Sequence, residues 1–416
     1  YTGATGYGNV EQKISVTPQT VFRMASMTKS FTAMAILQLR DRGKLSLDDA
    51  AQKWLPQLAA VKLPAGAPAL TIRHLLTHGG GLPQDDPWGD RQLADSDKEL
   101  IELMQQGFSF STLPGTTYEY SNLGYTLLGK IVTAVSGQPY QQYITQNILK
   151  PLGMHATYWE WKAVPPQNLA TGYRWMNGAW RPEALLHDGV WGAMGGLMTT
   201  LEDFGKYMAF HIAAWTDVPD AKDVVLKKSS LREMQSAQRF AGLNAGFKYA
   251  TGRTCAQTAA YGFGLRWTTD CTGRTTVGHS GGLPGFGSNW TILPEYGLGI
   301  VAFGNVTYAP LGGFHQQVLD TLLALSKIEK RQLKPSPILL QRQQELATLL
   351  PHWNGAEANK IFAENFFLDF PVDSLRKEAT EILAQIGTIK KIHPIVPMNN
   401  LRGTFLMEGE SGSAEV

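Results

Sequence analysis

The strongest constraint on the fold is one helix-forming stretch that is apolar almost all the way round. Residues Phe31 to Leu39 read Phe-Thr-Ala-Met-Ala-Ile-Leu-Gln-Leu, and the charged turn Arg40-Asp41-Arg42 and then Gly43 follow them. A helix without a polar stripe is buried on every side, because a surface helix keeps one polar face. Glycine after a charged last turn is a common helix stop. The fold must therefore surround this helix with other secondary structure.

A serine and a lysine precede this helix at a spacing that suits nucleophilic chemistry. They belong to the stretch Ser26-Met27-Thr28-Lys29, which follows extended residues up to Phe22. Residues three apart on a helix share a face, so the lysine amine can reach the serine hydroxyl and act as its base. The N-terminus of a helix also offers N–H groups and a positive field to an oxyanion. The spacing alone is not unique, since Ser374 and Lys377 repeat it.

Length and composition exclude several classes of partner. The chain has 416 residues, of which 43% are hydrophobic and 17% charged, which is typical of a globular protein with a large core and more than one domain. The net charge is +2, without a basic patch or polybasic run, so no nucleic-acid partner is expected. No apolar run reaches the ~18 residues of a transmembrane helix. The sequence leaves the oligomeric state open.

The cysteines and the first residue bear on the cellular location. Cys255 and Cys271 lie on either side of a predicted strand, and neither has a histidine or an acidic residue beside it. We expect one disulfide if the protein is exported, and two reduced thiols are the alternative. The chain begins with Tyr1 and has no charged-then-apolar leader, so we expect a signal peptide outside this sequence. The expected location is periplasmic or secreted.

The order of the predicted elements indicates an α+β fold. Short strands are expected before Phe22, a long helical region follows, and a last helix is expected over 314–327. Between them, strands are predicted at 261–268, 274–278, 288–293 and 298–304. This order predicts an antiparallel sheet flanked by helices, with a mostly helical subdomain, over residues 1–328.

A change in the sequence pattern predicts a second domain at residues 329–416. The run Lys334-Pro335-Ser336-Pro337 is typical of a linker. Helices are predicted after it near 338–350, 356–367 and 374–386, and the residues from 387 on are strand-like. This pattern predicts a small α+β accessory domain. It stops without a closing element, and truncation of the domain is one interpretation of this.

One ordered set of residues offers all the groups that acyl transfer needs. Ser26 is the nucleophile, Lys29 the base, and Tyr120 a hydroxyl that can relay the proton. An amide and a strand that can pair with a peptide-like substrate are also needed. These are offered by Asn122 and by the run His279-Ser280-Gly281-Gly282.

These motifs carry a resemblance to a known superfamily. Ser-Met-Thr-Lys at 26–29, Tyr-Ser-Asn at 120–122 and His-Ser-Gly at 279–281 resemble, in that order, the three motifs of serine β-lactamases and penicillin-binding proteins. The sequence is most similar to the branch of class C β-lactamases, D-alanyl-D-alanine carboxypeptidases and related esterases. The likeness covers about residues 1–327 and includes Pro151-Leu152-Gly153-Met154.

The resemblance implies a β-lactamase/transpeptidase-like fold and a mechanism. Ser26 forms an acyl-enzyme, while Lys29 and Tyr120 act together as base and then as acid. The N–H groups of Ser26 and Gly282 hold the oxyanion. Substrate is positioned by Asn122, His279, Ser280, Gly281 and Gly282. The implied chemistry needs no metal or organic cofactor.

The third motif departs from the β-lactamase pattern at His279. The β-lactamases of this superfamily carry lysine there, and imidazole, with an unperturbed pKa of ~6.5, is mostly neutral at pH 7. A neutral ring attracts a β-lactam carboxylate less. We therefore expect substrates among small amides, D-amino-acid peptides or esters. The alternatives are a true class C-like β-lactamase and a penicillin-binding sensor that is acylated without turnover.

Three other patterns compete with this set. Gly278-His279-Ser280-Gly281-Gly282 fits the G-x-S-x-G nucleophile elbow, but Pro284-Gly285 cannot open the helix that this motif requires. Ser374 has no tyrosine after it. His74 and His78 are four residues apart, as metal ligands can be, yet no third ligand is evident. We interpret these two histidines as buried residues bonded to loop carbonyls.

Overall fold

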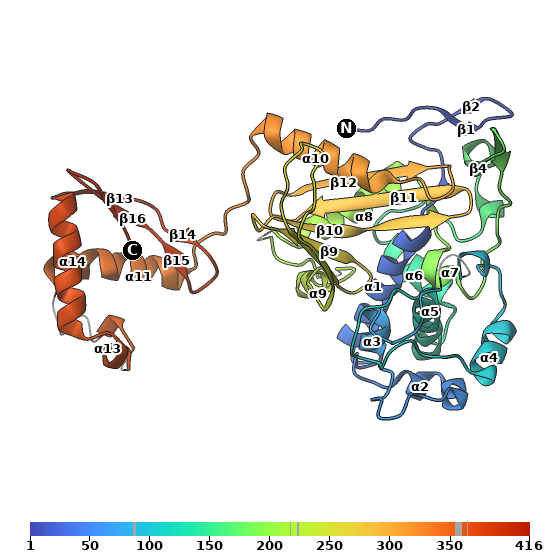
Figure 1. Cartoon of the computed structure of the whole chain (residues 1–416), viewed down its shortest axis with the longest axis horizontal. Helices are drawn as coiled ribbons and strands as arrows, with labels where there is room; N and C mark the ends of the chain where they lie inside the picture. The colour runs from blue at the N-terminus through green and yellow to red at the C-terminus, as the bar shows by residue number, and fades with distance from the viewer. Residues whose placement is uncertain (86–88, 217, 223, 354–359, 364) are drawn as a thin grey trace. The chain divides into compact units, whose positions relative to one another are not determined.

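The computed structural model describes residues 1–85, 89–216, 218–222, 224–353, 360–363 and 365–416. The chain divides into two compact units, Tyr1–Glu329 and Lys330–Val416. The predicted α+β class is confirmed, since both units combine helices with antiparallel strands (Figure 1). Within the described ranges, every helix is too short or too polar to cross a bilayer.

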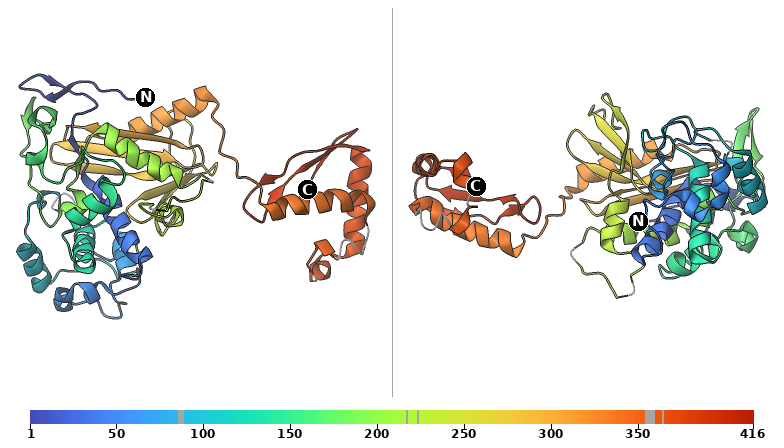
Figure 2. Two further views of the ribbon diagram at one scale, coloured as in Figure 1. Left: turned by 180° about the vertical axis from the view of Figure 1, so that it is seen from behind. Right: turned by 90° about the horizontal axis from the view of Figure 1, so that it is seen from below.

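A six-stranded antiparallel sheet forms the frame of the first unit. Its strand order is β12-β11-β10-β9-β8-β7. The strands are β7 (Arg239–Asn244), β8 (Gln257–Tyr261), β9 (Arg266–Asp270), β10 (Thr275–Leu283), β11 (Phe286–Leu293) and β12 (Leu298–Gly304). Helix α10 (Leu311–Ser326) and helix α8 (Leu201–Ala213) both contact β11 and β12, from opposite faces of the sheet (Figures 1 and 2).

The single strand predicted at 261–268 is wrong. Strand β8 ends at Tyr261 and β9 begins at Arg266, with a turn between them. Gly264 in this turn has φ +70, which favours glycine, and a Cβ on it would lie 2.8 Å from the carbonyl oxygen of Lys29. The turn is thus shaped to pack on the buried helix. Strands β10 and β11 also extend beyond the predicted 274–278 and 288–293.

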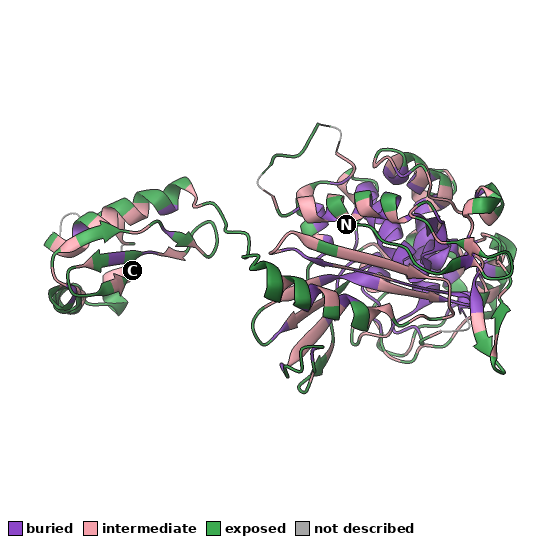
Figure 3. Ribbon diagram, turned by 90° about the horizontal axis from the view of Figure 1, so that it is seen from above, coloured by how far each residue is buried: buried purple, intermediate pink, exposed green. Residues whose placement is uncertain are grey.

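The helix that constrains the fold is α1 (Lys29–Asp41), and its burial is confirmed. Every residue from Lys29 to Leu39 is buried. Helix α1 is contacted by the helices α5 (Asn122–Ser136), α6 (Tyr140–Ile144), α7 (Gly192–Gly195) and α9 (Lys228–Met234). The ring of Phe31 stacks on that of Tyr207 from α8 at 3.9 Å. Full burial of each large apolar side chain contributes about 1.5–3 kcal/mol. Gly43, with φ +68, follows the helix as expected. Figure 3 shows the buried segments gathered inside this unit.

Shorter elements complete the first unit. The remaining helices are α2 (Ala51–Trp54), α3 (Ile72–Leu76), α4 (Asp97–Gln106), α5 (Asn122–Ser136), α6 (Tyr140–Ile144), α7 (Gly192–Gly195) and α9 (Lys228–Met234). The remaining strands form the pairs β1 (Tyr7–Asn9) with β2 (Ile14–Ser15), β3 (Phe22–Arg23) with β6 (Met198–Thr199), and β4 (Tyr173–Met176) with β5 (Ala179–Pro182). Short helical turns of 3₁₀ or π type lie at Ala25–Thr28, Pro56–Ala60, Gly89–Arg91, Thr145–Leu149, Trp161–Ala163 and Pro166–Asn168.

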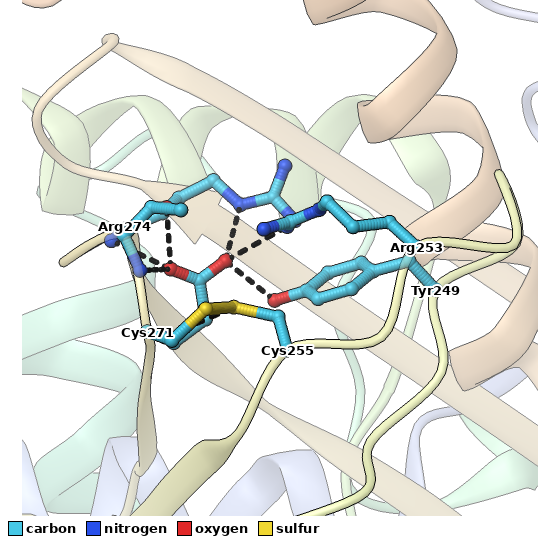
Figure 4. The surroundings of a disulfide bond; sticks show 7 residues. Tyr249, Arg253, Cys255, Cys271 and Arg274 are labelled. Atoms are coloured by element: carbon cyan, nitrogen blue, oxygen red, sulfur yellow. Dashed lines mark hydrogen bonds and ion pairs between the residues drawn. A yellow bond between two sulfur atoms is a disulfide. The ribbon is translucent and has the colours of Figure 1, made fainter.

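A disulfide joins Cys255, just before β8, to Cys271, just after β9. Beside it, the Asp270 carboxylate accepts hydrogen bonds from Tyr249 Oη at 2.8 Å and from Arg253 at 3.0 Å (Figure 4). Arg274 Nε lies 3.6 Å from the same oxygen, Oδ2, and the backbone N–H of Arg274 donates to Oδ1 at 3.1 Å. The disulfide and these bonds fix the end of the β9–β10 hairpin.

The second unit has its own small core. Its three-stranded sheet has the order β13 (Ile389–Ile392), β16 (Leu406–Gly409), β17 (Ser413–Glu415), beside the pair β14 (Val396–Pro397) and β15 (Gly403–Thr404). Its helices are α11 (Pro337–Leu349), a 3₁₀ turn (Leu350–His352), α13 (Phe366–Asp369) and α14 (Val372–Ile386). Leu339, Ile395, Phe405 and Met407 form the buried centre. Part of the helix predicted near 356–367, residues 356–359 and 364, lies outside the described residues. In the described part, α13 begins only at Phe366.

Candidate active site

Ser26 lies in a single 3₁₀ turn, Ala25–Thr28, that leads directly into α1. The residue before it, Ala25, has φ +49, a left-handed conformation that costs a residue with a Cβ about 1–2 kcal/mol. The surrounding structure holds this strained turn from both sides. Met24 donates its N–H to Leu197 O at 3.0 Å and accepts a hydrogen bond from Ser288 Oγ at 2.7 Å.

Lys29 joins the first two motifs through its buried amine. Its Nζ lies 3.0 Å from Ser26 Oγ and 2.6 Å from Asn122 Oδ1. A third contact runs to the backbone carbonyl of Met194, in α7, at 2.9 Å. A neutral amine has two N–H donors and one lone pair. In its neutral form the amine can accept the Ser26 proton across this 3.0 Å contact.

Asn122 is held in place by the first turn of α5. The Asp85 carboxylate accepts the N–H of Asn122 at 2.7 Å and that of Leu123 at 2.7 Å. Ser121 caps the same turn by accepting the N–H of Gly124 at 3.3 Å. Carboxylates at helix N-termini are stabilised by these N–H groups and by the helix dipole. The amide of Asn122 is therefore presented to Lys29 from a rigid helix end.

Tyr120 is buried beside Lys29, with 8% of its surface exposed. The amine of Lys29 lies 4.8 Å from the centre of the Tyr120 ring. The ring of His78 lies 4.3 Å away and the ring of His279 6.2 Å away. The guanidinium carbon of Arg266 lies 5.8 Å from the same ring. The structure thus brings the tyrosine, the lysine and the histidine of the three motifs together.

The third motif lies on β10, beyond the point where this strand pairs with β9. That pairing ends at Gly278, whereas the pairing with β11 continues from Val277 to Leu283. In the described part of the chain, residues 279–283 therefore have a strand neighbour on one side only. An edge of this kind can hydrogen-bond an extended peptide-like substrate.

The His279 ring is buried inside the protein, with 2% of its surface exposed. Its Nε2 lies 2.8 Å from Tyr261 Oη, and its Nδ1 contacts the carbonyl oxygen of Ser280. Because a carbonyl only accepts, Nδ1 carries the proton and Nε2 accepts from Tyr261. Burial, with added repulsion from Arg266 and Lys29, holds the pKa of His279 well below its usual 6.5. The ring is neutral at physiological pH.

The two glycines of the motif allow close approach of neighbouring groups. A Cβ on Gly281 would lie 2.3 Å from Met24 O and 2.3 Å from Ser288 Oγ. A Cβ on Gly282 would lie 2.3 Å from the Tyr308 ring. Real Cβ atoms do not approach other atoms this closely. A larger residue at Gly281 would push β10 away from the turn that carries Ser26, and one at Gly282 would displace the Tyr308 ring.

The competing patterns do not form catalytic arrangements. Ser280 lies within β10, which continues to Leu283 and turns into β11, so no helix follows it. Ser374 is exposed on α14 of the second unit. In the described ranges no cluster of three His, Cys, Asp or Glu side chains could hold a metal ion. The Nδ1 atoms of His74 and His78 accept the backbone N–H groups of Thr71 and Ser121. The predicted bond to a loop backbone is found for His74, whose ring also hydrogen-bonds the backbone of Ala69.

Several residues of this site gave no usable signal in the sequence. Met194 contributes a backbone carbonyl, which any residue type would supply. Asp85 and Arg266 are charged residues outside the three motifs. His78 forms a pair with His74 at a metal-ligand spacing, which does not indicate a contact with Tyr120. Their roles come from long-range packing, and no local pattern identifies them.

Comparison with known proteins identifies the family of the chain. A profile of the Beta-lactamase family matches residues 1–322. Protein flp of Staphylococcus aureus (strain MW2) is 30% identical over 310 residues, covering 73% of this chain and 57% of that protein. Beta-lactamase-like protein 2 of Dictyostelium discoideum is 33% identical over 225 residues, covering 52% of this chain and 41% of that protein. The chain thus spans about half the length of these relatives.

Solved structures are similar in fold. A penicillin-binding protein from Bacillus halodurans has a TM-score of 0.60 and 26% identity, covering 77% of this chain and 91% of that chain. A D-stereospecific amidohydrolase from Streptomyces sp. has a TM-score of 0.56 and 25% identity, covering 73% and 86%. An octameric penicillin-binding protein homologue from Pyrococcus abyssi, with a TM-score of 0.64, 24% identity and coverage of 100% and 82%, is similar in fold alone.

Proposed function

The chain belongs to the Beta-lactamase family of serine hydrolases, and we propose that it hydrolyses small amides, D-amino-acid peptides or esters through an acyl-enzyme at Ser26. The observation that carries this proposal is the 3.0 Å contact between Lys29 Nζ and Ser26 Oγ. Asn122 Oδ1 and the Met194 carbonyl also contact the amine, at 2.6 and 2.9 Å, and hold it in place. This arrangement supports a base that is aimed at the nucleophile.

The proposed reaction has two halves. In the first, neutral Lys29 takes the proton of Ser26 as its Oγ attacks the substrate carbonyl, and Tyr120 passes that proton to the leaving amine or alcohol. The N–H groups of Ser26 and Gly282 hold the oxyanion. In the second half, the same groups take a proton from water, which attacks the acyl-enzyme and releases the acid and Ser26.

Asn122, His279, Ser280 and Gly281 take positioning roles in this proposal. Asn122 orients the lysine amine and, with it, one side of the substrate. The backbone of β10 from His279 onward offers its unpaired edge to an extended substrate. The ring of His279, neutral and bonded to Tyr261, tunes the proton network and does not attract an anion.

We infer that Arg266 recognises a substrate carboxylate, in place of the lysine that β-lactamases carry at the position of His279. It is exposed on β9, opposite Gly278 of β10, and its guanidinium lies 5.8 Å from the Tyr120 ring. It is close enough to His279 and His78 to lower the pKa of both rings. A guanidinium pairs well with a carboxylate. Peptides with a free carboxyl group beside the cleaved amide suit this placement, as does the likeness to a D-stereospecific amidohydrolase.

A second candidate function is acylation by a β-lactam without turnover. The likeness to the penicillin-binding protein of Bacillus halodurans favours it, because that match covers 91% of the other chain. We also propose export to the periplasm or to the outside of the cell. The disulfide between Cys255 and Cys271 supports export, since disulfides persist in oxidising compartments.

A substrate panel tests the proposed function. The wild type would be offered a p-nitrophenyl ester, a peptide ending in D-Ala-D-Ala and nitrocefin, with Ser26→Ala and Ser280→Ala as matched variants. We expect turnover of the ester or the peptide, lost in Ser26→Ala and reduced but still present in Ser280→Ala. Turnover that survives in Ser26→Ala contradicts the proposal. Fast nitrocefin turnover identifies a β-lactamase instead, and a stable penicillin adduct without turnover of any substrate identifies the sensor.

A further inference from the structure

His78 contacts the chain on both sides of Tyr120. Its backbone carbonyl accepts the N–H of Glu119 at 2.8 Å, and its ring Nδ1 accepts the N–H of Ser121 at 3.1 Å. These two residues are the immediate neighbours of Tyr120. The ring of His78 also packs against the Tyr120 ring, with 4.3 Å between the centroids. One residue therefore holds both flanking peptide groups and one face of the tyrosine.

The backbone of His78 is strained in a way that the surrounding structure maintains. Its φ is +52, a left-handed conformation that a side chain with a Cβ disfavours. The residue follows α3, and its N–H is bonded to Leu75 O at 3.3 Å. Gly79 after it donates to His74 O at 2.8 Å. Strain of this kind persists at functional sites, where surrounding contacts over-determine the conformation.

The chemistry of the ring fits a fixed acceptor. His78 is 2% exposed, and burial, followed by repulsion from Lys29, His279 and Arg266, holds its pKa well below its ordinary value. A neutral ring that accepts at Nδ1 carries its proton at Nε2. Within the described residues Nε2 has no hydrogen-bond partner. The other titratable side chains whose rings pack against it are Tyr118, Tyr125 and Tyr261.

We infer that His78 is a positioning residue that holds Tyr120 in the orientation needed for proton relay beside Lys29. The inference rests on the function proposed above. His78 acts on the reaction only through Tyr120, whose ring centre lies 4.8 Å from Lys29 Nζ. Its ring supplies the acceptor for Ser121 N–H, and its carbonyl supplies the acceptor for Glu119 N–H. Only the first of these can be removed by changing the side chain.

Two substitutions separate the acceptor from the ring. His78→Phe keeps a planar ring against Tyr120 and removes the acceptor for Ser121 N–H. His78→Asn keeps an acceptor close to the place of Nδ1 and removes most of the ring. The matched control is His74→Phe. His74 lies in α3, just before His78, and its Nδ1 also accepts a backbone N–H, that of Thr71 at 3.3 Å. Melting temperatures would be recorded for all variants.

Two measurements report the reactivity of Ser26, and neither requires the natural substrate. One is the rate at which a fluorophosphonate probe labels Ser26. The other is kcat and KM for p-nitrophenyl acetate between pH 6 and pH 9. We expect His78→Phe to lower the labelling rate and kcat by about 10- to 100-fold, as for a misplaced catalytic group, with little change in KM. His78→Asn should regain most of the lost rate, and His74→Phe should behave as the wild type.

Two results would overturn the inference. One is a wild-type labelling rate and kcat in folded His78→Phe, and the other is an equal loss in His78→Asn and His78→Phe. If His78→Phe does not fold, a loss of about tenfold or more in folded His78→Asn overturns it as well. Ser26→Ala is measured in parallel. Labelling that survives in Ser26→Ala means that the proposed function has failed, whereas its loss there with normal His78→Phe means that only the role of His78 has failed.

Discussion

Reducing the disulfide between Cys255 and Cys271 should lower stability by an amount that follows from the loop it closes. The two cysteines are 16 residues apart in sequence. In the chain-entropy treatment, closing a loop of this size removes about 10 cal/mol/K from the unfolded state, or about 3 kcal/mol at 25 °C. Reduction returns that entropy to the unfolded chain, so the folded first unit becomes less stable by the same amount.

This free energy translates into a modest melting shift because the unit is large. The first unit spans residues 1–329. At about 2.1 cal/mol/K per residue, its unfolding entropy is about 690 cal/mol/K, so about 3 kcal/mol corresponds to about 4 °C. Activity at 25 °C should be retained. His279 lies four residues along β10 from Thr275, about 13 Å from that strand end, and the Asp270 bonds remain.

Tryptophan fluorescence provides the assay, since every tryptophan except Trp353 lies in the first unit. The wild type would be melted with and without tris(2-carboxyethyl)phosphine, and thiol titration would verify reduction. The double variant Cys255→Ser with Cys271→Ser is the control and should not respond to the reductant. A shift of less than about 1 °C in fully reduced protein, or one of more than about 10 °C, would refute the entropic reasoning.

Two further predictions concern charge. Arg266→Gln should raise KM about tenfold or more for a peptide with a free carboxyl group and change KM for an uncharged ester far less, because only the peptide offers a carboxylate to the guanidinium; equal effects on both substrates would contradict this role. Burial lowers the pKa of His211 to about 3, below its unfolded value, so the unfolded state binds the proton more readily. The free energy of unfolding should therefore fall by about 1.4 kcal/mol per pH unit for this residue as the pH drops from about 6.5 towards 3. Urea denaturation at pH 7 and pH 5 measures the free energy of unfolding at each pH. If His211→Asn loses as much of this free energy between the two pH values as the wild type does, the prediction is contradicted.

The central helix and the three motifs could be predicted because each depends on residues close together in the sequence. Burial of α1 follows from its apolar sequence, and Ser26 with Lys29 follows from helical spacing. The strand at 261–268 was mispredicted because its apolar and aromatic residues suit a strand. The turn there is set by the packing of Gly264 on Lys29, a contact between segments more than 200 residues apart that no local pattern contains.

The supporting contacts of the site could not be predicted for the same reason. Met194 offers only a carbonyl, and Asp85 caps α5 from a distant loop. His78 holds Tyr120 from a segment about 40 residues earlier. The sequence predicts weak anion binding at the third motif, because His279 stands where β-lactamases carry lysine. The burial of the His279 ring and its bond to Tyr261 appear only in the folded chain.

The most direct test of this account is the identity of the acylated residue during turnover. Enzyme mixed with excess p-nitrophenyl acetate would be quenched in acid within the burst, digested and mapped by mass spectrometry. The account predicts an acetyl group on Ser26, absent from Ser26→Ala and retained in Ser280→Ala. An acetyl group on Ser280 or Ser374, or normal ester turnover without any adduct at Ser26, would contradict it.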